Sequence, residues 1–340
     1  MGAEFINKSQ PTMSGVHINA PLTNVSIAYI QDEADFVADK VFPVVPVKNI
    51  SNIFYKMNKS YWFRSEAKER AEGTESVGSG FGLDRDTYMC HVYALHSDLS
   101  DQQVSNADSV IELESTTAIF VTQQLLLVKE KKFADAYFKT GVWSKDYVGV
   151  ETKDELEDGK FLQWDNPDSD PYNDIRKGRM KIKKSTGYRP NKMVISEEVF
   201  EVLCMHPKIK EMYKYVSSDS INTKMLANYF KVDEILIAGA VENTSVESVK
   251  EDDVETDMNF FLNNGILLVY VAKKVGPRIP TAGITFSWIG GVMGGFATTI
   301  KKFYMQWLES TRIEGQTAFE HKLVAKDLGV YFSNVISAED

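Results

Sequence analysis

The longest hydrophobic pattern of the chain lies between Asp108 and Lys139. Apolar and small residues recur there at steps of three and four, which places them on one stripe of a helix. They are Leu113, Thr117, Phe120, Val121, Gln124, Leu125, Val128, Phe133 and Tyr137. Ser109 and Glu112 form a capping box that predicts the start, and Gly141 follows the end. We therefore expect one helix over 108–139, about 45 Å long, with partners along its stripe.

Between Asn49 and Leu99 the pattern changes to period two, which is typical of strands. The alternating residues are Ile53, Tyr55 and Met57 in a first segment and Tyr88, Cys90, Val92 and Ala94 in a second. The connection between them is charged and rich in glycine, and it is far longer than a hairpin turn. We expect an extended hairpin that projects outward and contacts another subunit. The candidate contact residues are Arg64, Glu66, Lys68, Glu69, Arg70 and Glu72.

Residues 192–272 alternate short strands and helices, which predicts an α/β domain with its own sheet. The expected strands are 193–195, 234–237 and 266–271, and the expected helices are 197–205, capped by Ser196, and 225–230. The run 266–271 is apolar throughout, as in a strand covered on both faces. Upstream, Asp170 and Pro171 predict a helix over 171–184 after a polar interval. Segments 284–288, 300–308 and 323–335 are expected to return to the long helix.

The N-terminal 24 residues are polar and aperiodic, so we expect an arm. Residues 25–41 carry apolar residues among acidic ones. Residues 42–47 follow with two prolines, which favours an extended segment that lies across another surface. The first dozen residues are expected to be a leader, with Met13 as the natural start.

Composition excludes several classes of protein. A chain of 340 residues with 43% hydrophobic residues buries a core and ordinarily forms two or three domains. The net charge of −10, with basic residues spread along the chain, argues against a protein that grips nucleic acid through phosphates. Cys90 and Cys204 lack zinc-ligand spacing, so a reducing compartment and no metal are expected. No apolar run is long enough to cross a membrane.

Candidate chemistry is sparse. His91, His96, His206 and His321 lie in no nucleophile motif, and a cationic His206 is expected at a helix end. Asn166, Asp168 and Asp170 alternate as in a calcium loop, but the turn glycine and closing glutamate are missing. The pairs at Gly290 and Gly294 match no phosphate-binding loop. We therefore predict no catalytic residue, no cofactor and no enzyme.

Several motifs taken together resemble tailed-phage major capsid proteins. Residues 186–196 read TGYRPNKMVIS, His206-Pro207 follows the next helix, and residues 229–240 read YFKVDEILIAGA. Further similarities are DKVFP at 39–43, Ser169-Asp170-Pro171, and Asp327-Leu328-Gly329. The resemblance covers about residues 21–336.

The resemblance implies an α+β fold of the HK-ninety-seven type. Its parts would be an N-terminal arm (1–48), an E-loop (49–99), a P-domain with a spine helix (100–186), an A-domain (187–297) and a return to the P-domain (298–340). It implies hexamers and pentamers in an icosahedral virion shell around double-stranded DNA, assembled in the host cytoplasm. A separate scaffolding protein, a portal and a decoration protein are the expected partners, without a membrane or sequence-specific DNA binding.

Two other functions remain open at this point. Encapsulin-type nanocompartments share this fold, and they would differ from a phage shell in their neighbouring genes. An α/β enzyme or binding module would instead behave as a monomer at all concentrations.

Overall fold

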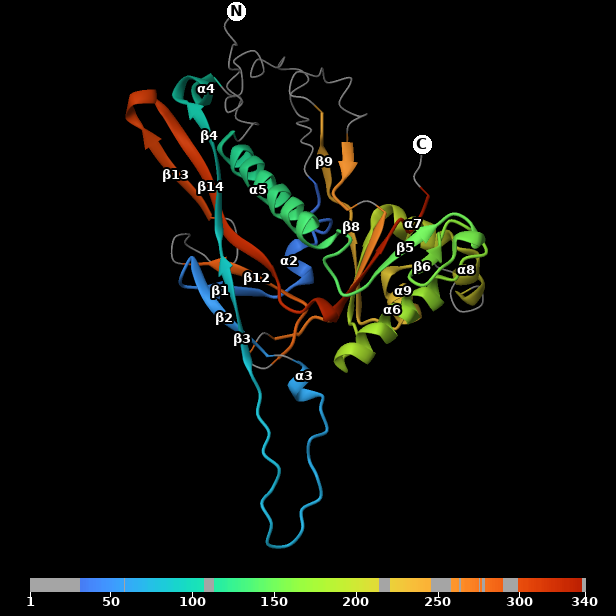
Figure 1. Cartoon of the computed structure of the whole chain (residues 1–340). Helices are drawn as coiled ribbons and strands as arrows, with labels where there is room; N and C mark the ends of the chain where they lie inside the picture. Colours follow the sequence, from blue (N-terminus) through green and yellow to red (C-terminus); the bar gives the residue numbers. More distant parts are fainter. Residues whose placement is uncertain are drawn as a thin grey trace, which may run out of the picture.

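The computed structural model describes residues 31–57, 59–106, 113–213, 221–245, 258–262, 264–274, 276, 279–289 and 299–337. The expected leader, the capping box at Ser109 and Glu112, and the glycine pairs at 290 and 294 lie outside these residues. Figure 1 shows two sheets on either side of a long helix and a hairpin that extends away from both.

The long helix is α5 (Leu113–Tyr137), and it lies on a five-stranded sheet. The sheet has the order β1-β12-β14-β13, and β4 also pairs with β14. Its strands are β1 (Val44–Val47), β4 (His91–Ser100), β12 (Gly283–Trp288), β13 (Thr299–Met305) and β14 (Ser310–Leu323). A Cβ at Gly315 of β14 would lie 2.4 Å from Val121 Cγ1, so glycine permits this close crossing. Strand β14 itself was not among the segments expected to return to the helix. Within the predicted segment 323–335, Leu328 and Tyr331 join the core that contains Phe133 and Tyr137 of α5.

The second sheet has six strands in the order β6-β5-β15-β11-β7-β8. They are β5 (Asp146–Val150), β6 (Lys160–Leu162), β7 (Lys192–Ser196), β8 (Glu234–Ala238), β11 (Gly265–Val269) and β15 (Gly329–Ser333). The helices packed with this sheet are α6 (Pro171–Thr186), α7 (Glu197–Met205), α8 (Pro207–Tyr213) and α9 (Thr223–Phe230).

All five residues of β11 are buried because the sheet is covered on both faces, as predicted. Ile266 and Leu268 join the core beneath α6, α7 and α9. Leu267 and Val269 join the core that contains Phe133 of α5. Alternate residues of one strand therefore belong to two different cores.

The pairing of β5, β6 and β15 departs from the predicted division, which assigned them to the P-domain. These strands complete the sheet that contains β7 and β11. Phe161 and Trp164, from the supposedly polar interval, are almost fully buried. Strands of three to five residues give too short an alternation to be detected, and their partners lie far away in the sequence.

The predicted helix 108–139 is shorter at its C-terminal end, and its stripe differs at one position. Trp143 Nε1 donates to the Tyr137 carbonyl at 2.8 Å and satisfies a terminal acceptor where α5 ends. Phe120 is 51% exposed, whereas Val121 and Leu125 are buried. Phe120 therefore lies on the outer face, not on the buried stripe.

Most of the other local predictions match the structure. Asp170 accepts from the Asn173 N–H at 3.1 Å at the start of α6, and Gly187 closes that helix with a left-handed backbone. Two details differ: the Ser196 side chain makes no cap hydrogen bond to α7, and Pro207 begins the unpredicted α8.

The hairpin consists of β2 (Ser51–Met57) and β3 (Leu83–Met89), paired antiparallel from Ser51 with Met89 to Met57 with Leu83. It contains the short helix α3 (Lys59–Trp62). At its root the Tyr88 ring stacks on Phe286 of β12, with centroids 4.3 Å apart. In Figure 1 the loop beyond the strands extends away from the rest of the fold.

The segment before the hairpin contacts α5 between Gln31 and Phe42, and the predicted extended residues 44–47 then join the five-stranded sheet. It includes α2 (Ala38–Val41), and β1 pairs in parallel with β12. Phe42 packs against Tyr137, with ring centroids 4.7 Å apart. The remaining elements are α4 (Asp101–Asn106), β9 (Val241–Asn243), β10 (Met258–Phe260) and the 3-10 turns η1 (Lys153–Glu155), η3 (Gln306–Leu308) and η4 (Lys326–Leu328).

Candidate assembly surface

The six predicted contact residues all lie in the loop between α3 and β3, beyond the paired part of the hairpin. Five of them are exposed, and Glu66 is half-buried. Arg64 Nη1 lies 4.0 Å from Glu66 Oε1, and the Ser79 hydroxyl donates to Glu66. The structure thus places the six residues on one projecting loop, where their charges face solvent.

Ion pairs fasten the root of the hairpin to the body. Asp86 of β3 pairs with Lys56 of β2, and Lys322 Nζ of β14 lies 3.2 Å from Asp86 Oδ1. Burial raises the pKa of Asp86, but hydrogen bonds from Lys56, the Thr87 N–H and Lys322 outweigh it and hold the pKa at about 2. Lys59 pairs with Asp327. The root is therefore held at two points, which sets the direction of the loop.

The loop also carries aromatic side chains that the charge-based prediction missed. Trp62, Phe63 and Phe81 are 55%, 62% and 59% exposed. The Trp62 and Phe81 rings lie 5.5 Å apart, across the base of the loop. Grouped apolar side chains on a surface mark contact sites. The run Tyr61-Trp62-Phe63, directly before the charged stretch, was the available signal in the sequence.

A second exposed apolar group lies at the far end of the five-stranded sheet. Trp307 of η3 is 93% exposed, and Tyr304, Leu308 and Phe303 are also exposed. Tyr304 Oη donates to Asp101 at 2.7 Å, which holds the turn beside α4. In Figure 1 this end of β13 and β14 and the hairpin loop lie at opposite ends of the molecule.

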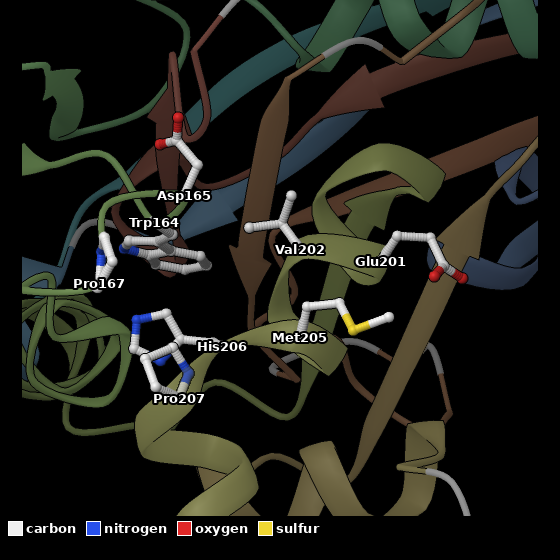
Figure 2. A pocket seen from close by; sticks show the side chains of 8 residues that line it. All are labelled: Trp164, Asp165, Pro167, Glu201, Val202, Met205, His206 and Pro207. Carbon is white, nitrogen blue, oxygen red and sulfur yellow. The ribbon is translucent and has the colours of Figure 1, made fainter.

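A pocket of about 430 Å³ lies on the α/β part, between α7, α8 and the loop after β6. Figure 2 shows the Glu201 carboxylate pointing away from Trp164 and His206. The Ser337 hydroxyl donates to Asp165 at 2.5 Å. The lining is mainly apolar. In Figure 2 the Asp165 and Glu201 carboxylates lie apart from each other and from the His206 ring.

The expected cationic state of His206 is corrected by its surroundings. His206 is 3% exposed, and its Nε2 lies 3.0 Å from Ser169 Oγ. Burial, and after it Lys208, lowers the pKa of the ring. His206 is therefore a neutral core residue at pH 7.

The other histidines and the candidate calcium ligands form no catalytic or metal centre in the described part of the chain. His91 and His96 are exposed. Burial and then Lys129 lower the pKa of His321 to about 3. Asp168 pairs with Lys153 at 2.6 Å, and no described group of three His, Cys, Asp or Glu residues is arranged to hold a metal.

None of the described helices has the length and apolarity needed to span a bilayer.

Comparisons with known proteins agree with this architecture. Residues 150–276 match the family described as phage major capsid protein E. The major capsid protein of Burkholderia phage BcepMu is 25% identical over 325 residues, which cover 94% of this chain and 96% of that protein.

Solved structures show the same fold over nearly the whole chain. A phage-related protein from Bordetella bronchiseptica superposes with a TM-score of 0.66 at 21% identity, covering 90% of this chain and 93% of that one. The capsid of cyanophage P-SCSP1u gives a TM-score of 0.59 at 9% identity, with 96% of each chain covered. A chain of Gordonia phage Cozz gives 0.55 at 8% identity, covering 100% and 99%. The resemblance to tailed-phage major capsid proteins is thereby confirmed, and the chain has the α+β shell fold of the HK-ninety-seven type.

Proposed function

We propose that this chain is the major capsid protein of a tailed phage, and that its copies form hexamers and pentamers of an icosahedral shell. The observation that carries the proposal is the hairpin loop, whose backbone extends away from the rest of the fold (Figure 1). Its charged residues are mostly exposed, and aromatic residues are exposed at its base. Such a loop gains little stability within its own subunit, so its side chains are available to a second copy. The nanocompartment alternative is not favoured, because the family match and the curated relative are both phage capsid proteins.

The arrangement of apolar surfaces supports ring formation. The loop aromatics and the group around Trp307 lie on different, distant parts of one subunit (Figure 1). A contact between two different surfaces of identical subunits is head-to-tail, and it gives closed rings when the rotation closes. We propose that Arg64, Glu66, Lys68, Glu69, Arg70 and Glu72 contribute to this contact by pairing with opposite charges on the neighbour.

The parts of the subunit receive roles under this proposal. Residues 1–48 are the arm and 49–99 the E-loop. The P-domain contains α4, α5, β13 and β14, and the A-domain contains the six-stranded sheet with α6 to α9. Compared with the division expected from sequence, β5, β6, α6 and β15 move to the A-domain because they pair or pack with β7 and β11.

The charge of the subunit suits a container for DNA. At a net charge of −10, a subunit repels the phosphate backbone and leaves packaged DNA able to move. We propose that double-stranded DNA is enclosed without sequence-specific contacts. Assembly would take place in the host cytoplasm, with a separate scaffolding protein, a portal and a decoration protein as partners.

Negative-stain microscopy with a loop deletion tests the proposal. The purified chain is expected to form capsomer rings or closed shells. Deletion of residues 66–82 should leave a folded subunit with an unchanged far-ultraviolet spectrum that no longer assembles. A matched control replaces the same residues by a Gly/Ser linker of equal length, which keeps the reach of the loop but removes its side chains. Uniform small particles from the intact chain, or normal assembly of both variants, would contradict the proposal.

A further inference from the structure

One face of α5 is covered over only half of its length. A single stripe contains Thr116, the neighbours Ile119 and Phe120, then Gln123, Leu127 and Glu130, with steps of three or four residues from one turn to the next. This stripe lies opposite Val121 and Leu125, which pack on β14 at Gly315. Glu130 is 1% exposed, whereas Ile119 and Phe120 are 42% and 51% exposed. Within the described part of the chain, the N-terminal half of the stripe is therefore exposed, with Ile119 and Phe120 as its apolar side chains.

The covered half is occupied by the chain segment that precedes β1. The backbone N–H groups of Val37 and Ala38 donate to Glu130 Oε2 at 3.1 and 3.0 Å. Further along the helix, Gln123 Nε2 donates to the Gln31 carbonyl at 3.2 Å. As the segment is followed back from Val37 to Gln31, it runs along the stripe from Glu130 to Gln123. Its direction leads toward Phe120 and Ile119.

Gln31 is firmly placed at the point where the described segment begins. Its side chain forms a paired contact with the backbone of Val241, with Nε2 donating to the carbonyl at 2.9 Å and Oε1 accepting from the N–H at 3.0 Å. The thirty residues before Gln31 therefore leave from a fixed position beside the middle of α5. The seven residues from Gln123 to Thr116 span about 10 Å of helix, which an extended chain covers in roughly three residues.

The chemistry of the two surfaces matches. Between Glu114 and Lys129 the helix carries no charged side chain, in a chain that is 25% charged. Residues 13–30 likewise contain no acidic residue, lysine or arginine, and the last six include Val25, Ile27 and Ile30. A nucleic acid is a poor occupant because the stripe offers no cation for phosphates. An attached apolar segment has a high effective concentration at a site next to its anchor.

We propose that residues 25–30 of the same chain cover the exposed stripe of α5 at Thr116, Ile119 and Phe120, continuing the path of residues 31–42. This inference does not depend on the proposed shell function, since it concerns contacts within one subunit.

Hydrogen exchange read by mass spectrometry tests this proposal on the full chain. Amides of residues 25–30 are expected to exchange at least tenfold more slowly than in a free peptide of the same sequence, at every protein concentration. Phe120→Asp should remove that protection, because a charge would have to be buried under the segment. Met180→Asp is the matched control, since Met180 is a 46% exposed apolar residue on another helix. It should leave the protection unchanged.

A change on the segment side keeps the test decisive if Phe120→Asp fails to fold. Ile27→Asp should also remove the protection of residues 25–30, while the rest of the chain exchanges as before. Fast exchange of residues 25–30 in the unaltered chain would overturn the proposal, as would equal protection in all variants. Protection that appears only at concentrations where the chain associates would also overturn it, because the occupant would then be a second copy.

Discussion

Glu130 is the buried charge whose removal gives the clearest prediction. It lies on α5 under Val37 and Ala38, and its second oxygen, Oε1, has no partner among the described residues. Burial raises its pKa to about 7; the two backbone hydrogen bonds oppose this shift, and Asp39 adds to it while Lys40 opposes it. The carboxyl of the folded protein is therefore mainly protonated below about pH 7.

The sign and size of the effect follow from proton linkage. Between pH 4.5, the ordinary pKa of a glutamate, and pH 7, the folded state binds more protons than the unfolded state. The contribution of Glu130 to the free energy of unfolding is then largest below pH 4.5, and it decreases as the pH rises to 7. A shift of this size corresponds to about 3 kcal/mol, at about 1.4 kcal/mol for each pKa unit.

Glu130→Gln removes the titration and retains an oxygen that accepts from Val37 and Ala38. We expect the fall in unfolding free energy between pH 5 and pH 8 to be smaller in this variant by about 2–3 kcal/mol. The assay is urea unfolding followed by tryptophan fluorescence at several pH values, in which the contributions of all other groups cancel in the difference. Asp135→Asn, a half-exposed carboxylate of the same helix, is the control. An identical pH dependence in the unaltered chain and Glu130→Gln would refute the reasoning.

Three further changes test the packing. Gly315→Val places side-chain atoms against Val121 and Leu125, where a Cβ alone would lie 2.4 and 2.8 Å from them, and should cost at least ~1–3 kcal/mol in chemical unfolding. Leu125→Asp should abolish soluble expression, since it buries an unpaired charge beneath α5, whereas Leu125→Met should not. Asn191→Ala should cost ~2 kcal/mol, because the side chain both donates to and accepts from the Val271 backbone at 2.8 Å; a melting temperature equal to that of the unaltered chain would contradict this.

Local signals in the sequence predicted those elements whose ends are specified nearby. Helix α6 has its capping residue Asp170, a proline at its first position and Gly187 at its end, all within the segment itself. The first strand of the hairpin was recognisable because Ile53, Tyr55 and Met57 alternate within β2. The second predicted strand, 88–94, instead spans the end of β3 and the start of β4, which pairs with β14. Asn191 belongs to a recognisable sequence motif. Its two hydrogen bonds to Val271 could not be predicted, because the partner lies 80 residues away in the sequence.

Features that depend on remote partners were not accessible from the sequence. Phe120 and Leu125 have the same hydrophobic character and lie in one helix, yet only Leu125 meets β14. Strand β5 is recognisable only once β15 lies beside it, and β6 only through its pairing with β5. The aromatic residues of the loop have the side chains of core residues, and the one sequence signal against a core position is the charged stretch that follows them. Their 55–62% exposure shows that they lie on the surface.

The position of β15 has a consequence for synthesis of the protein. This strand lies between β5 and β11 and is hydrogen-bonded to both, although it is made after both of them. Until Ser333 leaves the ribosome, β5 and β11 have no neighbour to join them, and the α/β half stays divided. Pairings of such long sequence separation form late and slowly. A nascent chain therefore cannot complete this sheet before β15 has been synthesised, so the order of the strands itself delays folding of the α/β half.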